Sequence, residues 1–240
     1  MSIRKSYGSG LYATGEAHLY VGPLESRAGL PPVVVCHGAN GTALTTNTDA
    51  NVYPAVRACA TNDLATLAGD LGGTNTWGND TSRARVSDAK TYLQGSAHSA
   101  KAGGVLLLGI SMGALTALLW AKANPTLVRA TALLIPELDP TTVHDTNRGG
   151  FAAAIEAAYG GLAGWNAAKA THDPSIDAAS YTGFPIAIWN SSNDSIGTPA
   201  ATVASWAVAA GATTHSLGAV GHDSSGINTQ QLLDFFAQYA

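Results

Sequence analysis

Charged side chains are scarce in this sequence. Lys and Arg contribute 12 residues and Asp and Glu 16, which is 12% of the 240-residue chain, against a usual share of about 25%. The basic residues form no cluster, and the formal net charge is −4. A chain without a basic patch is poorly suited to nucleic acid or to anionic membranes, so we expect neither as a partner.

Long hydrophobic runs and a leader are also missing. No apolar stretch approaches the ~20 residues that a membrane-spanning helix needs, so no transmembrane segment is expected. The first ten residues are polar and glycine-rich and lack the basic and apolar parts of an export signal. We therefore expect a cytoplasmic protein.

Cysteine is represented only by Cys36 and Cys59. A chain of this length buries a large core and forms one α/β-sized domain, 1–240, without disulfide support. The sequence leaves the pairing of the two thiols open. His, Cys and Asp nowhere show the spacing of a metal site, and we expect neither a metal ion nor a cofactor.

The strongest pattern present is VLLLGISMGALTALLWAKAN, residues 105–124. Val105–Leu108 is short and wholly apolar, which predicts a central strand of a parallel sheet. A helix is predicted from Met112 to Asn124, ended by Pro125. The glycines of the intervening GISMG allow a sharp turn that lifts Ser111 above the sheet edge, at the start of the helix. A glycine-rich turn with an incidental serine is the alternative, but this strand–turn–helix setting is that of a nucleophile elbow.

Strand and helix patterns alternate along most of the chain, which predicts an α/β fold with a mostly parallel central sheet and helices on both faces. Further strands are expected at Tyr7–Ala13, Ala17–Val21, Val33–Cys36, Leu64–Ala68, Arg129–Ile135, Phe184–Trp189 and Thr213–Leu217. Further helices are expected at Val52–Ala60, Thr81–Gln94, Pro199–Ala210 with Thr198 as N-cap, and after Asn228. The rhythm lapses at 141–183, which we interpret as a helical cap inserted over the rim of the sheet.

A serine nucleophile needs a base and two hydrogen-bond donors for the oxyanion. The expected donors are the amides of Met112, next to the serine, and of Ala39, in the loop HGANGT after a buried strand. Asn40 of the same loop could replace Ala39, and His37 is expected to orient the loop.

His222 is the expected base, because it follows the last strand and precedes the last helix. Asp194, in the loop after an earlier strand, is expected to hold the second ring nitrogen of His222, in the chain order Ser, Asp, His. Glu137 and Asp139 follow the strand after the elbow helix and are its rivals.

HGANG, GISMG, NDSIGTP and GHD together resemble the α/β-hydrolase fold over nearly the whole chain. The resemblance implies a serine hydrolase of esterase or lipase type. The short motif Asn147-Arg148-Gly149-Gly150 also resembles hydrolases encoded by actinobacterial phages, which suggests a place on a phage particle as an alternative to the cytoplasm.

The expected substrate is a small-molecule or lipid ester. Its binding wall is predicted to include Asn40, Trp77, Phe151 and Trp165. An amidase, thioesterase or acyltransferase would use the same residues, and a non-catalytic binding module on a cell surface or virion is the competing class. The sequence indicates neither the acyl chain length nor the oligomeric state.

Overall fold

The computed structural model describes residues 3–9, 15–23, 29–95 and 101–240. It holds an eight-stranded sheet in the order β1-β2-β4-β3-β5-β6-β7-β8. The strands are β1 (Ile3–Ser9), β2 (Ala17–Pro23), β3 (Val33–Cys36), β4 (Thr66–Gly69), β5 (Val105–Ile110), β6 (Val128–Leu134), β7 (Ile186–Asn190) and β8 (Thr213–Ser216). β2 pairs antiparallel with β1 and β4, and the other described pairs are parallel. The predicted α/β fold with a mostly parallel sheet is confirmed.

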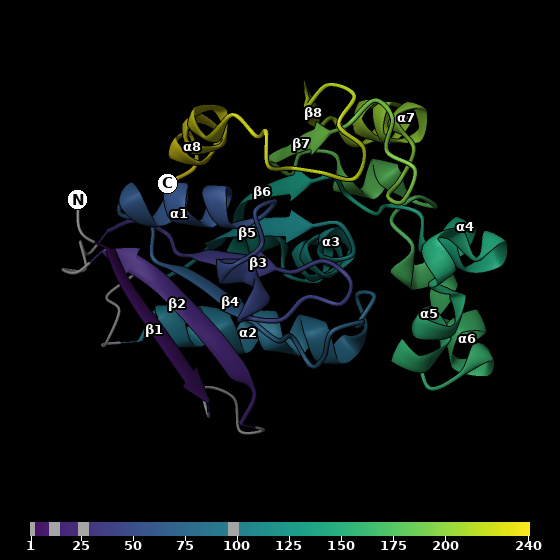
Figure 1. Ribbon diagram of the computed structural model, residues 1–240, viewed down its shortest axis with the longest axis horizontal. Helices are drawn as coiled ribbons and strands as arrows, with labels where there is room; N and C mark the ends of the chain where they lie inside the picture. Colours follow the sequence, from purple (N-terminus) through teal and green to yellow (C-terminus); the bar gives the residue numbers. More distant parts are fainter. Residues whose placement is uncertain (1–2, 10–14, 24–28, 96–100) are drawn as a thin grey trace.

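Helices cover both faces of the sheet (Figure 1). α1 (Tyr53–Thr61) and α8 (Thr229–Ala237) pack on one face, and α2 (Asp80–Leu93), α3 (Gly113–Ala123) and α7 (Ala200–Ala210) on the other. Strand side chains alternate between the two layers: Leu106 and Leu108 join the core under α1 and α8, and Leu107 joins the core under α3. Every residue of β3 and β5 is buried, because both faces of these apolar strands are covered.

The sheet begins with a hairpin. β1 and β2 pair from Ile3 opposite Pro23 to Ser9 opposite Ala17. The first strand therefore starts before Tyr7, where the prediction placed its beginning, and the rest of the predicted strand, 10–13, lies outside the described residues.

The connection between β6 and β7 carries the helices that interrupt the strand–helix rhythm. It contains α4 (Pro140–Thr146), η3 (Arg148–Gly150), α5 (Ala152–Ala158), α6 (Leu162–His172) and η4 (Ala178–Tyr181). Figure 1 shows α4, α5 and α6 gathered at one end of the molecule, beside the sheet layers rather than on them. We call residues 141–183 the insertion.

α3 ends at Ala123, before Pro125, and α8 starts directly after Asn228, both as predicted. Gly211 adopts a left-handed φ of 70° and closes α7, and the Asn228 side chain accepts hydrogen bonds from the first amides of α8. Thr198, predicted as the N-cap of α7, does not cap it. Pro199 occupies the cap position, because the Thr198 hydroxyl is engaged with Glu137 across the sheet edge.

Cys36 and Cys59 are both buried free thiols. Burial raises the pKa of each thiol to about 12, so neither is a nucleophile at neutral pH. In the described part of the chain, no helix has the length and apolar character needed to cross a membrane.

Candidate active site

Ser111 stands on a strained turn between β5 and α3. Its φ is 51°, in the left-handed region that a non-glycine residue rarely adopts. The turn is held by hydrogen bonds from the Ser111 amide to Leu134 O and from the Glu137 amide to Ser111 O, each 3.0 Å. A Cβ on Gly113 would overlap the carbonyl of Cys36, so only glycine lets α3 approach β3 this closely. The elbow thus places Ser111 directly after the carboxyl end of β5, where its side chain points out of the sheet toward His222.

Ser111, His222 and Asp194 form a continuous hydrogen-bonded chain. His222 Nε2 lies 2.8 Å from Ser111 Oγ, and His222 Nδ1 lies 2.8 Å from Asp194 Oδ2. An ionised carboxylate only accepts hydrogen bonds, so Nδ1 donates and Nε2 is left to accept from the serine hydroxyl. The structure brings together the three side chains that the sequence singled out, from three separate loops at one sheet edge.

The Asp194 carboxylate is held by its own loop. Its Oδ1 accepts hydrogen bonds of 2.9 Å and 2.8 Å from the amides of Ile196 and Gly197. Burial tends to raise the pKa of Asp194, but the hydrogen bond and charge of His222 and these two amides outweigh it and hold the pKa below its ordinary value. The side chain is 3% exposed. Asp194 therefore stays ionised beside the imidazole.

The two rival acids are engaged elsewhere. Glu137, also 3% exposed, accepts from Arg148 Nη2 at 2.6 Å, from the Thr198 hydroxyl at 2.7 Å and from the Asp139 amide at 2.8 Å. Burial raises the pKa of the Glu137 carboxyl, and Arg148, the Asp139 amide and Thr198 oppose that rise. The Asp139 side chain caps α4 by accepting from the Thr142 amide.

Two backbone amides are free to serve an oxyanion. Within the described residues, the amides of Ala39 and Met112 donate no hydrogen bond. The Asn40 amide is engaged, at 2.8 Å from Thr74 O, which removes the alternative that the sequence left open. The His37 ring lies between the carbonyl oxygens of Gly38 and Asp70, at 2.8 Å and 3.0 Å, a position that steadies the loop carrying Ala39.

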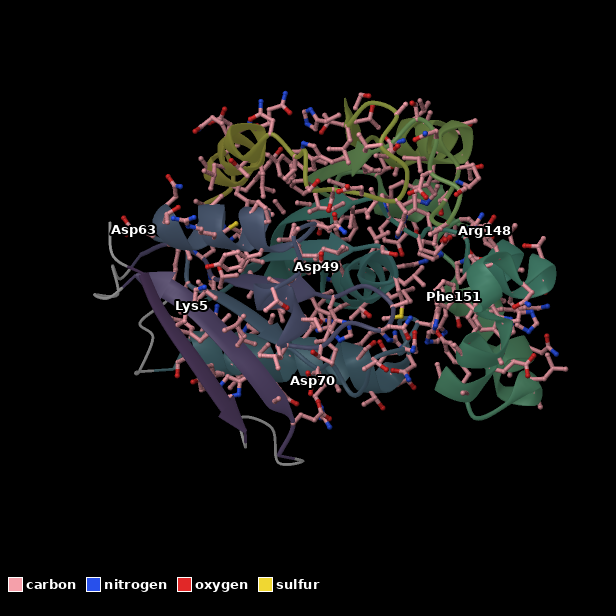
Figure 2. The ribbon with its side chains drawn as sticks, viewed as in Figure 1. Lys5, Asp49, Asp63, Asp70, Arg148 and Phe151 are labelled. Carbon is pink, nitrogen blue, oxygen red and sulfur yellow. The ribbon has the colours of Figure 1, made fainter. Side chains whose placement is uncertain are left out.

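A cavity of about 240 Å³ opens beside Ser111 and His222. Its apolar wall includes Trp77 and Phe151, whose rings are 5.2 Å apart. Val52, Ile110, Ile135 and Ile196 add to the apolar lining. The segment before α1 contributes a polar wall of Thr45, Thr46, Asp49 and Asn51. Figure 2 labels Phe151 where the insertion meets the body of the molecule and Asp49 apart from it, near the middle of the view. The full lining is His37, Gly38, Ala39, Gly41, Thr45, Thr46, Asp49, Asn51, Val52, Trp77, Ile110, Ser111, Ile135, Glu137, Phe151, Ile196 and His222.

Two residues predicted to bind substrate do not line this cavity. Trp165 is 0% exposed and belongs to a buried cluster that joins Val143 and Ile155 of the insertion to Trp77, Met112 and Leu115 outside it. It therefore fills the core between the insertion and the body of the molecule. The side chain of Asn40 turns to Asn75, whose amide nitrogen lies 2.8 Å away. Trp77 and Phe151 are the predicted wall residues that the structure places at the cavity.

Hydrogen bonds attach the insertion to the loop that carries Trp77. The Tyr159 hydroxyl donates to Trp77 O at 2.7 Å, and the Asn79 side chain donates to Ala158 O at 2.9 Å. Arg148 of η3 reaches Glu137 on the sheet side. Phe151 lies between these contacts in the sequence, with Arg148 before it and Ala158 and Tyr159 after it. The contacts therefore hold Phe151 at the cavity.

Sequence reasoning missed the part that three residues play near the site. Arg148 and Thr198 both bind Glu137, although they lie in segments far from one another in sequence. Asp49 lines the cavity from a segment that carries no recognisable motif. The only available signal was an acidic residue after a buried strand. That signal made Glu137 an alternative to Asp194 as the acid that binds His222, and it did not indicate that Glu137 binds Arg148 and Thr198.

The sequence matches the protein family described as "Putative esterase" over residues 29–224. No curated protein sequence matches the chain. An S-formylglutathione hydrolase from Agrobacterium tumefaciens has a similar structure, with a TM-score of 0.74 and 15% sequence identity over 99% of this chain and 94% of that one. A fungal esterase structure from Rhizomucor miehei gives a TM-score of 0.68 at 13% identity, over 100% of this chain and 86% of that one.

A puromycin-hydrolyzing peptidase from Mycobacterium tuberculosis is also similar, with a TM-score of 0.72 and 17% identity. The match covers 99% of this chain but 39% of the peptidase. At such identities the structural matches establish the fold, which is that of α/β-hydrolases, and leave the substrate to be argued from the site.

Proposed function

Because this chain belongs to the Putative esterase family and is a carboxylic ester hydrolase, we propose that it cleaves esters through a covalent acyl intermediate on Ser111. The observation that carries this proposal is the unbroken hydrogen-bonded chain from Ser111 through His222 to Asp194. A serine hydroxyl is a weak nucleophile until a base lies within hydrogen-bond reach, and His222 meets that condition.

Catalysis then proceeds in two halves. His222 Nε2 takes the proton of Ser111 Oγ as the oxygen attacks the ester carbonyl carbon, and the amides of Met112 and Ala39 bind the oxyanion. The tetrahedral intermediate collapses, the bond to the alcohol oxygen breaks, and His222 gives its proton to that oxygen. Water, deprotonated by His222 Nε2, next attacks the acyl-Ser111 carbonyl carbon. The bond from that carbon to Ser111 Oγ then breaks, His222 returns the proton to Ser111 Oγ, and the acid is released. Asp194 stabilises the imidazolium in both halves.

The cavity size favours short esters. A volume of about 240 Å³ is below the ~300–1,000 Å³ of pockets that take drug-sized ligands. We therefore place small-molecule esters ahead of long-chain lipids as substrates. The resemblance of Asn147–Gly150 to phage-encoded hydrolases stays a prediction about origin and has no part in this mechanism.

A fluorophosphonate probe tests the nucleophile. Wild-type protein should be labelled on Ser111, and Ser111→Ala should lose the label together with about 10⁵- to 10⁶-fold of kcat on p-nitrophenyl acetate. Ser205→Ala, which removes an exposed hydroxyl bonded only within α7, should change neither. Ester turnover by Ser111→Ala near the wild-type rate would defeat the proposal. A wild-type protein that is neither labelled by the probe nor active on esters would point to a binding module.

A further inference from the structure

One wall of the cavity beside Ser111 is built from polar side chains. They come from η1 (Thr45–Asn47) and the turn before α1: Thr45, Thr46, Asp49 and Asn51. A polar side chain beside an alkyl chain loses its hydrogen bonds to water. The hydroxyls of Thr45 and Thr46 avoid this loss by donating to Thr42 O, both at 3.0 Å, so a purely apolar ligand would cost hydrogen bonds at Asp49 and Asn51. The wall therefore points to a polar group on the substrate.

The charges around the cavity have one sign. Asp49 and Glu137 both line it, and of the described residues that do so none is Lys or Arg. Glu137 is neutralised by Arg148, which binds it from outside the cavity at 2.6 Å. Asp49 is thus the lining carboxylate with which no Lys or Arg of the described residues forms an ion pair. Such a wall repels anionic substrates and attracts cationic ones.

Asp49 is fixed in place by its own turn. Its Oδ1 accepts from the Asn51 amide at 2.8 Å, and its amide donates to Thr45 O at 2.7 Å. Its carbonyl oxygen accepts from the amides of Val52 and Tyr53 at 3.1 Å and 2.9 Å. A carboxylate positioned in this way loses little conformational freedom when it binds a ligand, which favours affinity. From the described residues, Oδ2 receives no hydrogen bond.

We propose that Asp49 binds a positively charged nitrogen on the substrate, so that this enzyme acts on short esters bearing an ammonium group. The inference rests on the proposed function and names the substrate class of that site. The aromatic side chains of Trp77 and Phe151 line the same cavity, and aromatic rings attract cations. Asp49 contacts the substrate away from the reacting carbonyl and determines specificity rather than chemistry.

Two esters of the same shape test the proposal. Acetylcholine, the acetate ester of choline, carries a quaternary nitrogen at the position where 3,3-dimethylbutyl acetate carries a carbon atom. Hydrolysis of either ester releases acetate. In wild-type protein at low salt, kcat/KM should favour the choline ester by about 5- to 10-fold, the size expected of one charge pair near the surface. In Asp49→Asn, which keeps an acceptor for the Asn51 amide, the ratio should fall to about one. Roughly 0.5 M NaCl should lower the wild-type ratio by screening the pair.

Asp88→Asn is the matched control, because it removes one negative charge from α2, outside the cavity lining. It should keep the wild-type ratio. Rapid hydrolysis of the neutral ester with a ratio near one in wild type would overturn the inference and leave the proposed function standing. An unchanged ratio in Asp49→Asn would overturn the assignment to Asp49. No hydrolysis of either ester would defeat the proposed function, and the inference with it.

Discussion

The hydroxyl of Thr198 donates a 2.7 Å hydrogen bond to the carboxylate of Glu137 and accepts another of 2.7 Å from the Leu138 amide. These bonds join the end of β6 to the loop after β7. Thr198 directly follows Gly197, whose amide binds Asp194. Glu137 also contacts the elbow, through its own amide and Ser111 O. Thr198 and Glu137 thereby fix the position of the loop that carries Asp194 relative to the elbow that carries Ser111.

Thr198→Val keeps the shape of the side chain and removes both bonds of the hydroxyl. Because the Leu138 amide then lacks its acceptor in a buried setting, we expect a loss of about 1–3 kcal/mol in unfolding free energy. We also expect roughly a tenfold lower kcat from a displaced Asp194, since small misplacements of a catalytic group are costly. Urea unfolding and p-nitrophenyl acetate kinetics measure the two effects. Thr198→Ser should restore kcat, and failure to do so would refute the positioning role.

Asp194→Asn should lower kcat by about 10⁴-fold, because the amide cannot fix the imidazole tautomer or stabilise the imidazolium. Asp139→Asn is the comparison, since Asn also caps helices well, and it should stay within a few-fold of wild type. Steady-state ester hydrolysis compares the two. A large loss in Asp139→Asn with a small one in Asp194→Asn would reverse the assignment of the acid.

Phe151→Ala should change the preference for acyl chain length, because Phe151 lines the cavity beside Ser111. Each methylene that gains or loses burial changes kcat/KM by about fourfold, at ~0.8 kcal/mol each. Trp165→Ala should instead cost about 3–5 kcal/mol of stability, as a large buried side chain does, and keep the chain-length profile. Kinetics on acetate through octanoate esters, with thermal melts, separate the two; identical profiles in wild type and Phe151→Ala would contradict this reading.

The insertion should lose stability as the pH rises past neutrality. The hydrogen bond to Asp145, and further that to Glu156, raises the pKa of His144 above its ordinary value. The ionised form is thus favoured in the fold. Its contribution is complete below pH ~6.5 and disappears as the pH rises through the folded-state pKa. The Tm difference between wild type and His144→Gln should therefore shrink between pH 6 and pH 9. A difference that does not vary with pH would show that His144 acts through packing alone.

Sequence patterns predicted the sheet and the elbow because their causes are local. The apolar strand Val105–Leu108 and the glycines around Ser111 allow few other structures. The pairing of Asp194 with His222 was also accessible, since loops at the carboxyl ends of parallel strands share one edge.

The sequence assigned wrong roles to Trp165 and Thr198, because each residue type can satisfy its side chain in two different ways. A tryptophan in an Ala- and Gly-rich segment can fill a core or line a cleft, and Trp165 fills the core. A threonine before proline can cap a helix or bind a distant acid, and Thr198 binds Glu137. The choice depends on which segments meet in space. The contact of Arg148 with Glu137 and the position of Asp49 at the cavity also depend on segments that meet in space, so the sequence around them did not predict either one.

The left-handed backbone of Ser111 lowers the stability of the fold at the position where activity requires a serine. A non-glycine residue held there costs about 1–2 kcal/mol, which the hydrogen bonds of the turn must offset in every folded molecule. Ser111→Gly should therefore yield a protein that is inactive yet harder to unfold than Ser111→Ala, although glycine usually weakens a fold.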